Sequence, residues 1–154
     1  MLIVTVGIAG SGKSYWSKEF VKTNPDWRIV STDTLRKQLT GNVSNQSQNK
    51  DVWRIAYAEL ESYLSDNINV IFDSTACNIS TVKKFVEIAN RFNSKIEFKV
   101  FYCDPKLAYK VIESDIEAGI DRSDVPFEVV KKQYKNFKEV VKYLKENNYT
   151  IRMF

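Results

Sequence analysis

The chain has 154 residues, of which 44% are hydrophobic and 27% are charged. These values are typical of one compact globular domain and exclude a disordered segment or two full domains. The 23 Lys and Arg residues exceed the 19 Asp and Glu residues, and the net charge of +4 permits an anionic partner such as a nucleotide, a phosphosugar or nucleic acid. Because histidine is absent, Ser-His-Asp triads and His-based zinc sites are excluded.

The first third of the chain predicts a strand, a turn, a helix and a second strand. Residues 2–6 form a continuous apolar run, which is typical of a strand buried on both faces in a parallel sheet. A glycine-rich turn follows, and the apolar spacing over residues 13–21 predicts a helix. Residues 27–31 predict the next strand, followed by a short helix that ends near Gly41. Residues 42–50 are polar, so we expect a surface loop there.

The middle of the chain repeats the alternation of helix and strand. An apolar stripe over residues 51–64 predicts a third helix, and residues 69–72 predict a third buried strand with Asp73 at its carboxyl end. A helix over residues 80–92 and an alternating strand over residues 96–102 follow. Strands that alternate with helices in this way indicate a parallel sheet.

The last third predicts two helices around a polar loop. Asp104 before Pro105 forms a good helix start, and the fifth helix is expected over residues 105–118. Residues 119–125 are polar and suit a mobile lid, and a long final helix is expected from Pro126. The end of the chain can add a fifth strand. The fold expected is a single α/β domain over residues 1–154, a three-layer sandwich with a parallel sheet of four to five strands and helices on both faces.

One face of the final helix is apolar and a row of lysines follows it. The row is most simply a solvated face, with contact to the phosphates of a nucleic acid as the alternative. The apolar positions are Val130, Tyr134, Phe137, Val141 and Leu144, and the lysines are Lys131, Lys135, Lys138, Lys142 and Lys145.

No segment predicts export or a membrane. No stretch approaches the roughly 20 apolar residues that cross a bilayer, and the apolar start lacks the features of a signal peptide. The two cysteines, Cys77 and Cys103, lie in apolar runs and are interpreted as buried free thiols of a reducing cytosol. We therefore expect a soluble, cytoplasmic protein. If a phage encodes it, the compartment would be the cytoplasm of the host cell.

The strongest functional signal is the segment Gly7–Ser14, which satisfies G-x-x-x-x-G-K-[ST] between a strand and a helix. Such a loop binds phosphates because glycine lets backbone N–H groups approach closely and the helix N-terminus adds positive potential. Lys13 would reach the β and γ phosphates, and the Ser14 hydroxyl would coordinate Mg²⁺. The residues expected to bind ATP are Gly10, Ser11, Gly12, Lys13, Ser14 and Tyr15.

A second candidate cluster is Thr32-Asp33-Thr34-Leu35-Arg36, directly after the second strand. Asp33 and Arg36 are three residues apart and share a face of a helical turn. A carboxylate there can take the proton of an attacking hydroxyl, and the arginine can hold an acceptor phosphate. The structural alternative is that Thr32 or Asp33 only caps the helix and that Arg36 is a surface residue with a local ion pair.

Two further side chains complete the candidate site. Asp73 follows the third strand, where a carboxylate beside the phosphate loop can bind Mg²⁺; the alternative is a cap of the following turn. Arg122 lies in the predicted lid, where it can stabilise the charge of a transferring phosphoryl group. The alternative is a solvated arginine paired with Asp121 or Asp124.

Four segments together make the chain similar to the phage-type polynucleotide 5′-hydroxyl kinases, within the P-loop kinases that act on hydroxyl acceptors. They are GIAGSGKSYW, DTLR, FDSTACN, and DRSDVP before KKQYKNFKE. The resemblance spans nearly the whole chain. It implies a kinase that uses ATP and Mg²⁺, with nucleic acid 5′ ends as its substrate and partner and no 3′-phosphatase domain. No obligate protein partner is evident, and a homo-oligomer is compatible with the sequence.

The resemblance also implies roles for individual residues. Lys13 and Ser14 would bind ATP and Mg²⁺, and Asp33 would be the general base for the 5′-hydroxyl. Arg36 would hold the neighbouring 3′-phosphate, and Arg122 would act on the phosphates of ATP. Thr75 and Asn78 match polar, substrate-binding positions of the third-strand motif.

Two other functions stay open. Where family members carry arginines, the helix before the lid is acidic here, with Glu113, Asp115 and Glu117. This favours a kinase for a small-molecule or modified-base hydroxyl, which D-x-x-R after the second strand also fits. A noncatalytic ATP-binding module is the third interpretation, but such a module would not need Asp33 and Arg36 together.

Overall fold

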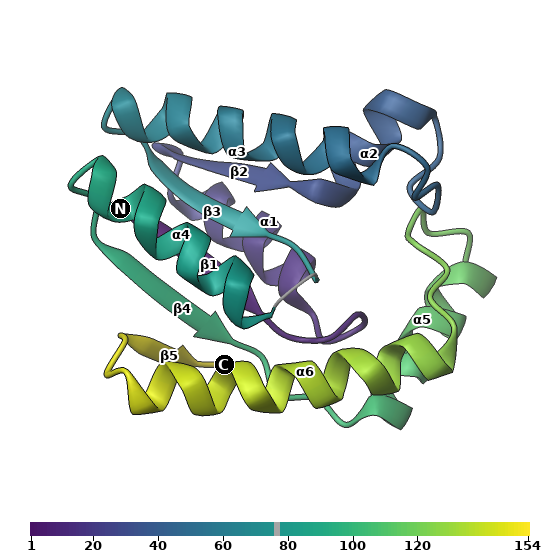
Figure 1. Cartoon of the computed structure of the whole chain (residues 1–154). Coiled ribbons are helices and arrows are strands. Elements are labelled where there is room, and N and C mark those ends of the chain that lie inside the picture. Colours follow the sequence, from purple (N-terminus) through teal and green to yellow (C-terminus); the bar gives the residue numbers. More distant parts are fainter. Residues whose placement is uncertain (76–77) are drawn as a thin grey trace.

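A computed structural model describes residues 1–75 and 78–154 of the chain. Its centre is a parallel sheet in which five strands run in the order β2-β3-β1-β4-β5. The strands are β1 (Leu2–Val6), β2 (Trp27–Ser31), β3 (Asn69–Asp73), β4 (Ile96–Val100) and β5 (Ile151–Met153). Because all strands point the same way, the ends of β1, β2 and β3 lie at one edge of the sheet, where their following loops meet (Figure 1).

Helices cover both faces of this sheet, which confirms the three-layer α/β fold expected from the sequence. Figure 1 shows α3, α4 and α6 in front of the sheet and α1 behind it. The helices are α1 (Lys13–Thr23), α2 (Thr32–Thr40), α3 (Asn49–Ser65), α4 (Ile79–Arg91), α5 (Pro105–Glu117) and α6 (Phe127–Glu146). Within the described ranges, no helix combines the length and the apolar character that a membrane crossing requires.

Three local expectations need correction. Ser31 caps α2, because its hydroxyl accepts the Thr34 N–H, so neither Thr32 nor Asp33 is the cap. The loop predicted over residues 42–50 is shorter, since α3 begins at Asn49. It is also only partly a surface loop, because the Val43 side chain is buried.

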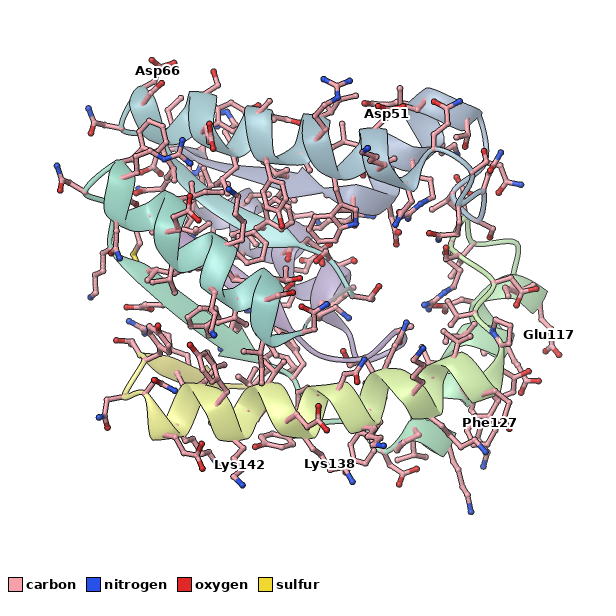
Figure 2. The ribbon with its side chains drawn as sticks, in the orientation of Figure 1. Asp51, Asp66, Glu117, Phe127, Lys138 and Lys142 are labelled. Atoms are coloured by element: carbon pink, nitrogen blue, oxygen red, sulfur yellow. The ribbon has the colours of Figure 1, made fainter. Side chains whose placement is uncertain are left out.

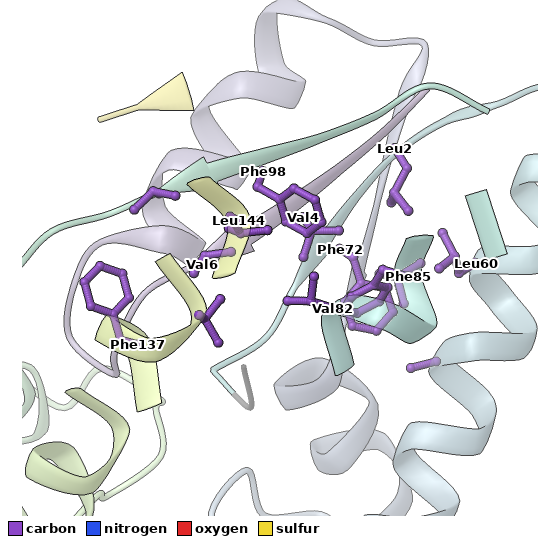
Figure 3. Packing of buried hydrophobic residues seen from close by; sticks show 14 of the residues in the cluster. Leu2, Val4, Val6, Leu60, Phe72, Val82, Phe85, Phe98, Phe137 and Leu144 are labelled. Atoms are coloured by element: carbon purple, nitrogen blue, oxygen red, sulfur yellow. The ribbon is translucent and has the colours of Figure 1, made fainter. Parts of the chain in front are cut away.

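The core lies between the sheet and its front helices (Figure 3). The rings of Phe72 in β3 and Phe85 in α4 are 4.6 Å apart, and both are almost fully buried. Val4 of β1 and Leu144 of α6 belong to the same cluster. Burying each such side chain stabilises the fold by roughly 1.5–3 kcal/mol. The core therefore fixes β1 and β3, whose carboxyl ends carry the candidate site.

Aromatic rings also pack behind the sheet. Trp16 and Phe20 of α1 have ring centroids 5.1 Å apart, and Phe20 meets Trp27 edge to face at 5.2 Å. On the other side of the sheet, Trp53 of α3 stacks on Phe72 at 5.8 Å. Each tryptophan is half-buried in such contacts, as expected for residues that pack against the core.

The apolar stripe of α6 is buried, apart from the half-buried Tyr134, and its lysine row is exposed, as the sequence predicts. Figure 2 shows Lys138 and Lys142 pointing away from the sheet. Cys103 is a free but only half-buried thiol, so its expected burial is incomplete. The expectation for Cys77 lies outside the described residues.

Candidate active site

The phosphate loop follows β1 directly and depends on Gly10. Its φ of +78° lies in the left-handed region, and a Cβ built on it would lie 2.3 Å from the Ala108 carbonyl oxygen of α5. No larger residue fits without movement of the backbone. At Gly12 the loop turns into α1, whose N-terminus has no side-chain cap. Because Gly12 has no side chain that could cap the first N–H groups of α1, this helix end is suited to bind an anion.

Lys13 lies folded over this loop. Its Nζ donates hydrogen bonds to the Ile8 carbonyl at 2.7 Å and to Ser11 Oγ at 3.4 Å, and the residue is almost fully buried. Ser14 and Tyr15 follow at the surface, and Tyr15 is 73% exposed. The predicted ATP-binding residues 10–15 thus lie together at the end of β1, but Tyr15 projects into solvent from the first turn of α1. Arg122, the other residue predicted to act on ATP, comes from a separate loop.

Asp73 ends β3 beside Lys13 and is 5% exposed. Burial raises the pKa of Asp73, while the charge of Lys13 and hydrogen bonds from Ser14 and Thr5 act to lower it. The negative charge of Asp33 also raises this pKa, so Asp33 lies within electrostatic reach of Asp73. The carboxylate, the lysine and the Ser14 hydroxyl thus converge at one edge of the sheet.

Asp33 and Arg36 lie on one face of α2, as their spacing predicts. Arg36 Nη1 donates to Asp33 Oδ1 at 2.6 Å, and Arg36 Nη2 donates to Asn49 Oδ1 at 2.9 Å. The Arg36 side chain is only 6% exposed, so the surface-residue alternative is wrong although the local ion pair is present. Arg36 Nε is buried, and the described part of the chain supplies no hydrogen-bond partner for it. A buried guanidinium with a spare N–H is suited to bind an anion.

Arg122 lies in the loop over residues 119–125, which the sequence predicts to be a lid, and it pairs with α5. Its Nη1 donates to Asp115 Oδ2 at 2.7 Å, so the predicted alternative pairing with Asp121 or Asp124 is not the one observed. Asp121 instead pairs with Lys37 of α2. Arg122 Nε is also buried without a hydrogen-bond partner among the described residues. The guanidinium is therefore partly committed to Asp115.

The predicted lid is joined to the loop over residues 42–48. Ser123 Oγ donates to the Val43 carbonyl at 3.1 Å, and the Asp124 N–H donates to Ser44 Oγ at 3.0 Å. In Figure 1 these two loops meet between α2 and α5, beyond the ends of β2 and β3. The two loops form a bridge between α2 and α5, which we call the lid bridge.

The predicted substrate residues after β3, Thr75 and Asn78, lie on either side of residues 76 and 77, which the structure does not describe. Thr75 is half-buried. Asn78 is exposed and caps α4, since its Oδ1 accepts the Thr81 N–H at 2.9 Å. This cap engages its carbonyl oxygen, which leaves the amide NH₂ of Asn78 as the group suited to a ligand.

Sequence reasoning missed several residues that contact the site. Asn49 accepts a hydrogen bond from Arg36, and Lys37 forms an ion pair with Asp121 of the predicted lid. Asp115 forms an ion pair with Arg122. Gln133 of α6 accepts the N–H of Ala9 in the phosphate loop. A signal for Gln133 was present in the sequence, because a polar residue three positions after Val130 falls on the apolar stripe of α6.

Known structures share this architecture. One chain of the Pnkp1/Rnl/Hen1 RNA repair complex superposes with a TM-score of 0.81 at 22% identity, covering 92% of this chain and 45% of that one. A second Pnkp1/Rnl/Hen1 structure gives 0.64 at 26% identity, covering 71% and 38%. A putative kinase from Chloroflexus aurantiacus gives 0.69 at 15% identity, covering 84% and 76%. The chain thus spans less than half the length of the first two proteins.

The fold shared with these proteins is that of a P-loop kinase. The model of the family described as AAA domain matches residues 2–140, which is most of the chain. This match includes the phosphate loop, Asp33, Arg36, Asp73 and Arg122, and it implies nucleotide binding. With a phosphate loop of the required geometry at the end of β1, the chain belongs to the AAA domain family of P-loop proteins.

Proposed function

We propose that the chain is an ATP-dependent kinase that transfers the γ-phosphate to the 5′-hydroxyl of a polynucleotide, DNA or RNA. The observation that carries the proposal is the Asp33–Arg36 pair, in which a half-exposed carboxylate and a buried arginine lie on the same side as Lys13 and Asp73. A module that only binds a nucleotide would not need this carboxylate and this arginine together. In the proposal, residues 1–154 form one kinase domain with a lid over residues 119–125, working in the cytoplasm.

The proposed acceptor side is the α2 face. Asp33 accepts the proton of the attacking hydroxyl, because its side chain is 45% exposed and open to an incoming group. Arg36 holds the phosphate next to that hydroxyl through its spare Nε–H and the adjacent Nη groups, since a guanidinium binds phosphate with two parallel hydrogen bonds. The side chains of Thr75 and Asn78 contribute further polar contacts to the acceptor.

The proposed donor side is the phosphate loop. Its N–H groups and Lys13 bind the β and γ phosphates of ATP, and Arg122 stabilises the charge on the transferring group. The donor set suits Mg²⁺, since Asp73 is a buried carboxylate with a hydrogen bond from the Ser14 hydroxyl. Ser14 and Asp73 would hold this ion together with the phosphates, where it would neutralise developing charge. Within the described residues there is no group of three His, Cys, Asp or Glu side chains that could hold a metal alone.

The Pnkp1/Rnl/Hen1 similarity supports a nucleic acid acceptor, since that complex is described as an RNA repair complex. One observation favours the second candidate, a kinase for a small-molecule or modified-base hydroxyl. Asp115 engages Arg122, and α5 carries Glu113 and Glu117 beside it, so the lid is less basic than a polyanionic substrate would favour.

The test is transfer of labelled γ-phosphate from ATP to a 5′-hydroxyl oligonucleotide and, in parallel, to a nucleoside 3′-monophosphate. Asp33→Asn should reduce transfer by about 10²–10⁴-fold, because the amide cannot accept the proton. The amide oxygen can still accept the Arg36 hydrogen bond, so the fold and ATP binding should be retained.

Asp26→Asn is the matched control, because Asp26 is exposed and directly precedes β2 at the end opposite to the site. It should transfer phosphate at the wild-type rate. Absence of transfer to both acceptors by a wild-type protein that binds ATP would refute the polynucleotide kinase and direct attention to small hydroxyl compounds.

A further inference from the structure

One contact ties the final helix to the phosphate loop. The Ala9 N–H donates to Gln133 Oε1 at 2.9 Å, and Ala9 is 3% exposed. A backbone N–H can only donate, so the partner atom must be the carbonyl oxygen of the Gln133 amide. The contact joins residues 124 positions apart in the chain. Gln133 is therefore the described partner of a buried loop N–H that would otherwise lack one.

The bonded group belongs to a peptide unit with a second task. The Ile8 carbonyl and the Ala9 N–H are parts of one planar peptide, so fixing one fixes the other. That carbonyl accepts hydrogen bonds from Lys13 Nζ at 2.7 Å and from the Ser11 N–H at 3.2 Å. Rotation of this peptide would turn the carbonyl away from the Lys13 ammonium group. The orientation of the peptide thus sets the position of Lys13.

The position of Gln133 is fixed by its buried neighbours on α6. Val130 and Phe137, three residues before it and four after it, are both buried on the same face of α6. The Phe137 ring meets Tyr102 edge to face at 5.2 Å, which attaches α6 to the segment that follows β4. The amide of Gln133 is therefore presented to the phosphate loop by a helix whose position the core determines.

We propose that Gln133 is a positioning residue that fixes the Ile8–Ala9 peptide and, through its carbonyl, places Lys13 for the phosphates of the nucleotide. The inference rests on the proposed role of Lys13 and holds for any acceptor hydroxyl. Without the amide, the loop reaches other conformations in which the Ala9 N–H meets water, and nucleotide binding must reverse that change.

The first experiment measures ADP and ATP affinity at equilibrium in a double-mutant cycle. Gln133→Met, which removes the acceptor at similar volume, should weaken binding about fivefold, the value of one net hydrogen bond. In a Lys13→Met background, the same substitution should change affinity by less than about twofold, because the group it positions is gone. Lys135→Met, an exposed position on α6, is the matched control and should bind as wild type.

Equal losses in both backgrounds, or no loss from Gln133→Met, would overturn the proposal. Neither measurement needs an acceptor, so a failure of the polynucleotide assay leaves the result interpretable. The ligand-free protein supplies a second readout, amide hydrogen exchange at Ala9. Exchange should be faster in Gln133→Met and remain slow in Gln133→Glu, whose carboxylate still accepts the N–H. Slow exchange in Gln133→Met would also refute the proposed role of this contact.

Discussion

The close approach of Gly10 to α5 predicts a large and specific cost for one added methyl group. In Gly10→Ala the new Cβ would lie 2.3 Å from the Ala108 oxygen and 2.9 Å from the Ala108 carbonyl carbon. Both atoms are backbone, so they cannot rotate away as a flexible side chain can. The left-handed φ costs about 1–2 kcal/mol for a residue with a Cβ, and forcing the backbones apart costs typically 1–3 kcal/mol more.

Gly41→Ala isolates the first of these two costs. Gly41 has a φ of +75°, close to that of Gly10, and apart from its chain neighbours no described residue has an atom within 4 Å of its added Cβ. Gly41→Ala should therefore lower the free energy of unfolding by about 1–2 kcal/mol, and Gly10→Ala by about 2–5 kcal/mol. Urea unfolding followed by circular dichroism measures both values.

The difference between the two variants decides the interpretation. If Gly10→Ala and Gly41→Ala destabilise equally, the contact with Ala108 is not a tight one and the steric reasoning is refuted. If the reasoning holds, Gly10→Ala should also weaken ADP binding, since the loop can relieve the clash only by moving the N–H groups that hold phosphate. Gly41→Ala, at the end of α2, should leave ADP binding unchanged.

Three further outcomes follow from other contacts. Glu97 is buried on β4, and the hydrogen bond from Arg152 of β5 holds the pKa of Glu97 below its ordinary value despite burial. The Glu97→Gln variant should therefore be less stable than the wild type at pH 7. In acid-unfolding scans this difference in stability should vanish as the pH falls through the lowered pKa. Lys37→Met removes the ion pair with Asp121, which joins the predicted lid to α2, so trypsin cleavage in the lid should rise about two- to fivefold. Because this ion pair is exposed and stabilises the fold only slightly, the melting temperature should stay within about 1 °C of the wild-type value. Phe85→Ala should cost about 3–5 kcal/mol in urea unfolding, and a cost below about 1 kcal/mol would contradict the packing against Phe72.

The phosphate loop and the α2 cluster were predictable because their signals are local. Gly7–Ser14 needs only a strand before it and a helix after it, and Asp33 and Arg36 need only helical spacing. The contacts of Arg122 were not predictable in this way. The structural alternative named Asp121 or Asp124 as its partner, and the fold supplies Asp115 from the preceding helix.

Contacts between distant segments depend on how the sheet is ordered. The order β2-β3-β1-β4-β5 brings α6 beside the phosphate loop, and no local sequence pattern predicts that order. The Gln133 to Ala9 contact is one result, and the lid bridge between Ser123 and Val43 is another. The cap of α2 was missed for a different reason, since Ser31, Thr32 and Asp33 are all good caps and only the backbone geometry selects Ser31.

The aromatic cluster behind the sheet makes the chain its own fluorescent reporter. Trp16 lies two residues after Ser14, against Phe20, so its indole senses the first turns of the helix that begins at the phosphate loop. Trp53 lies on the opposite side of the sheet and senses the packing of α3 on Phe72. Replacing Trp53 by phenylalanine would leave emission from Trp16 and Trp27 behind the sheet, and replacing Trp16 and Trp27 together would leave emission from Trp53 alone. Nucleotide binding and loss of core packing could then be followed as separate optical signals without an added label.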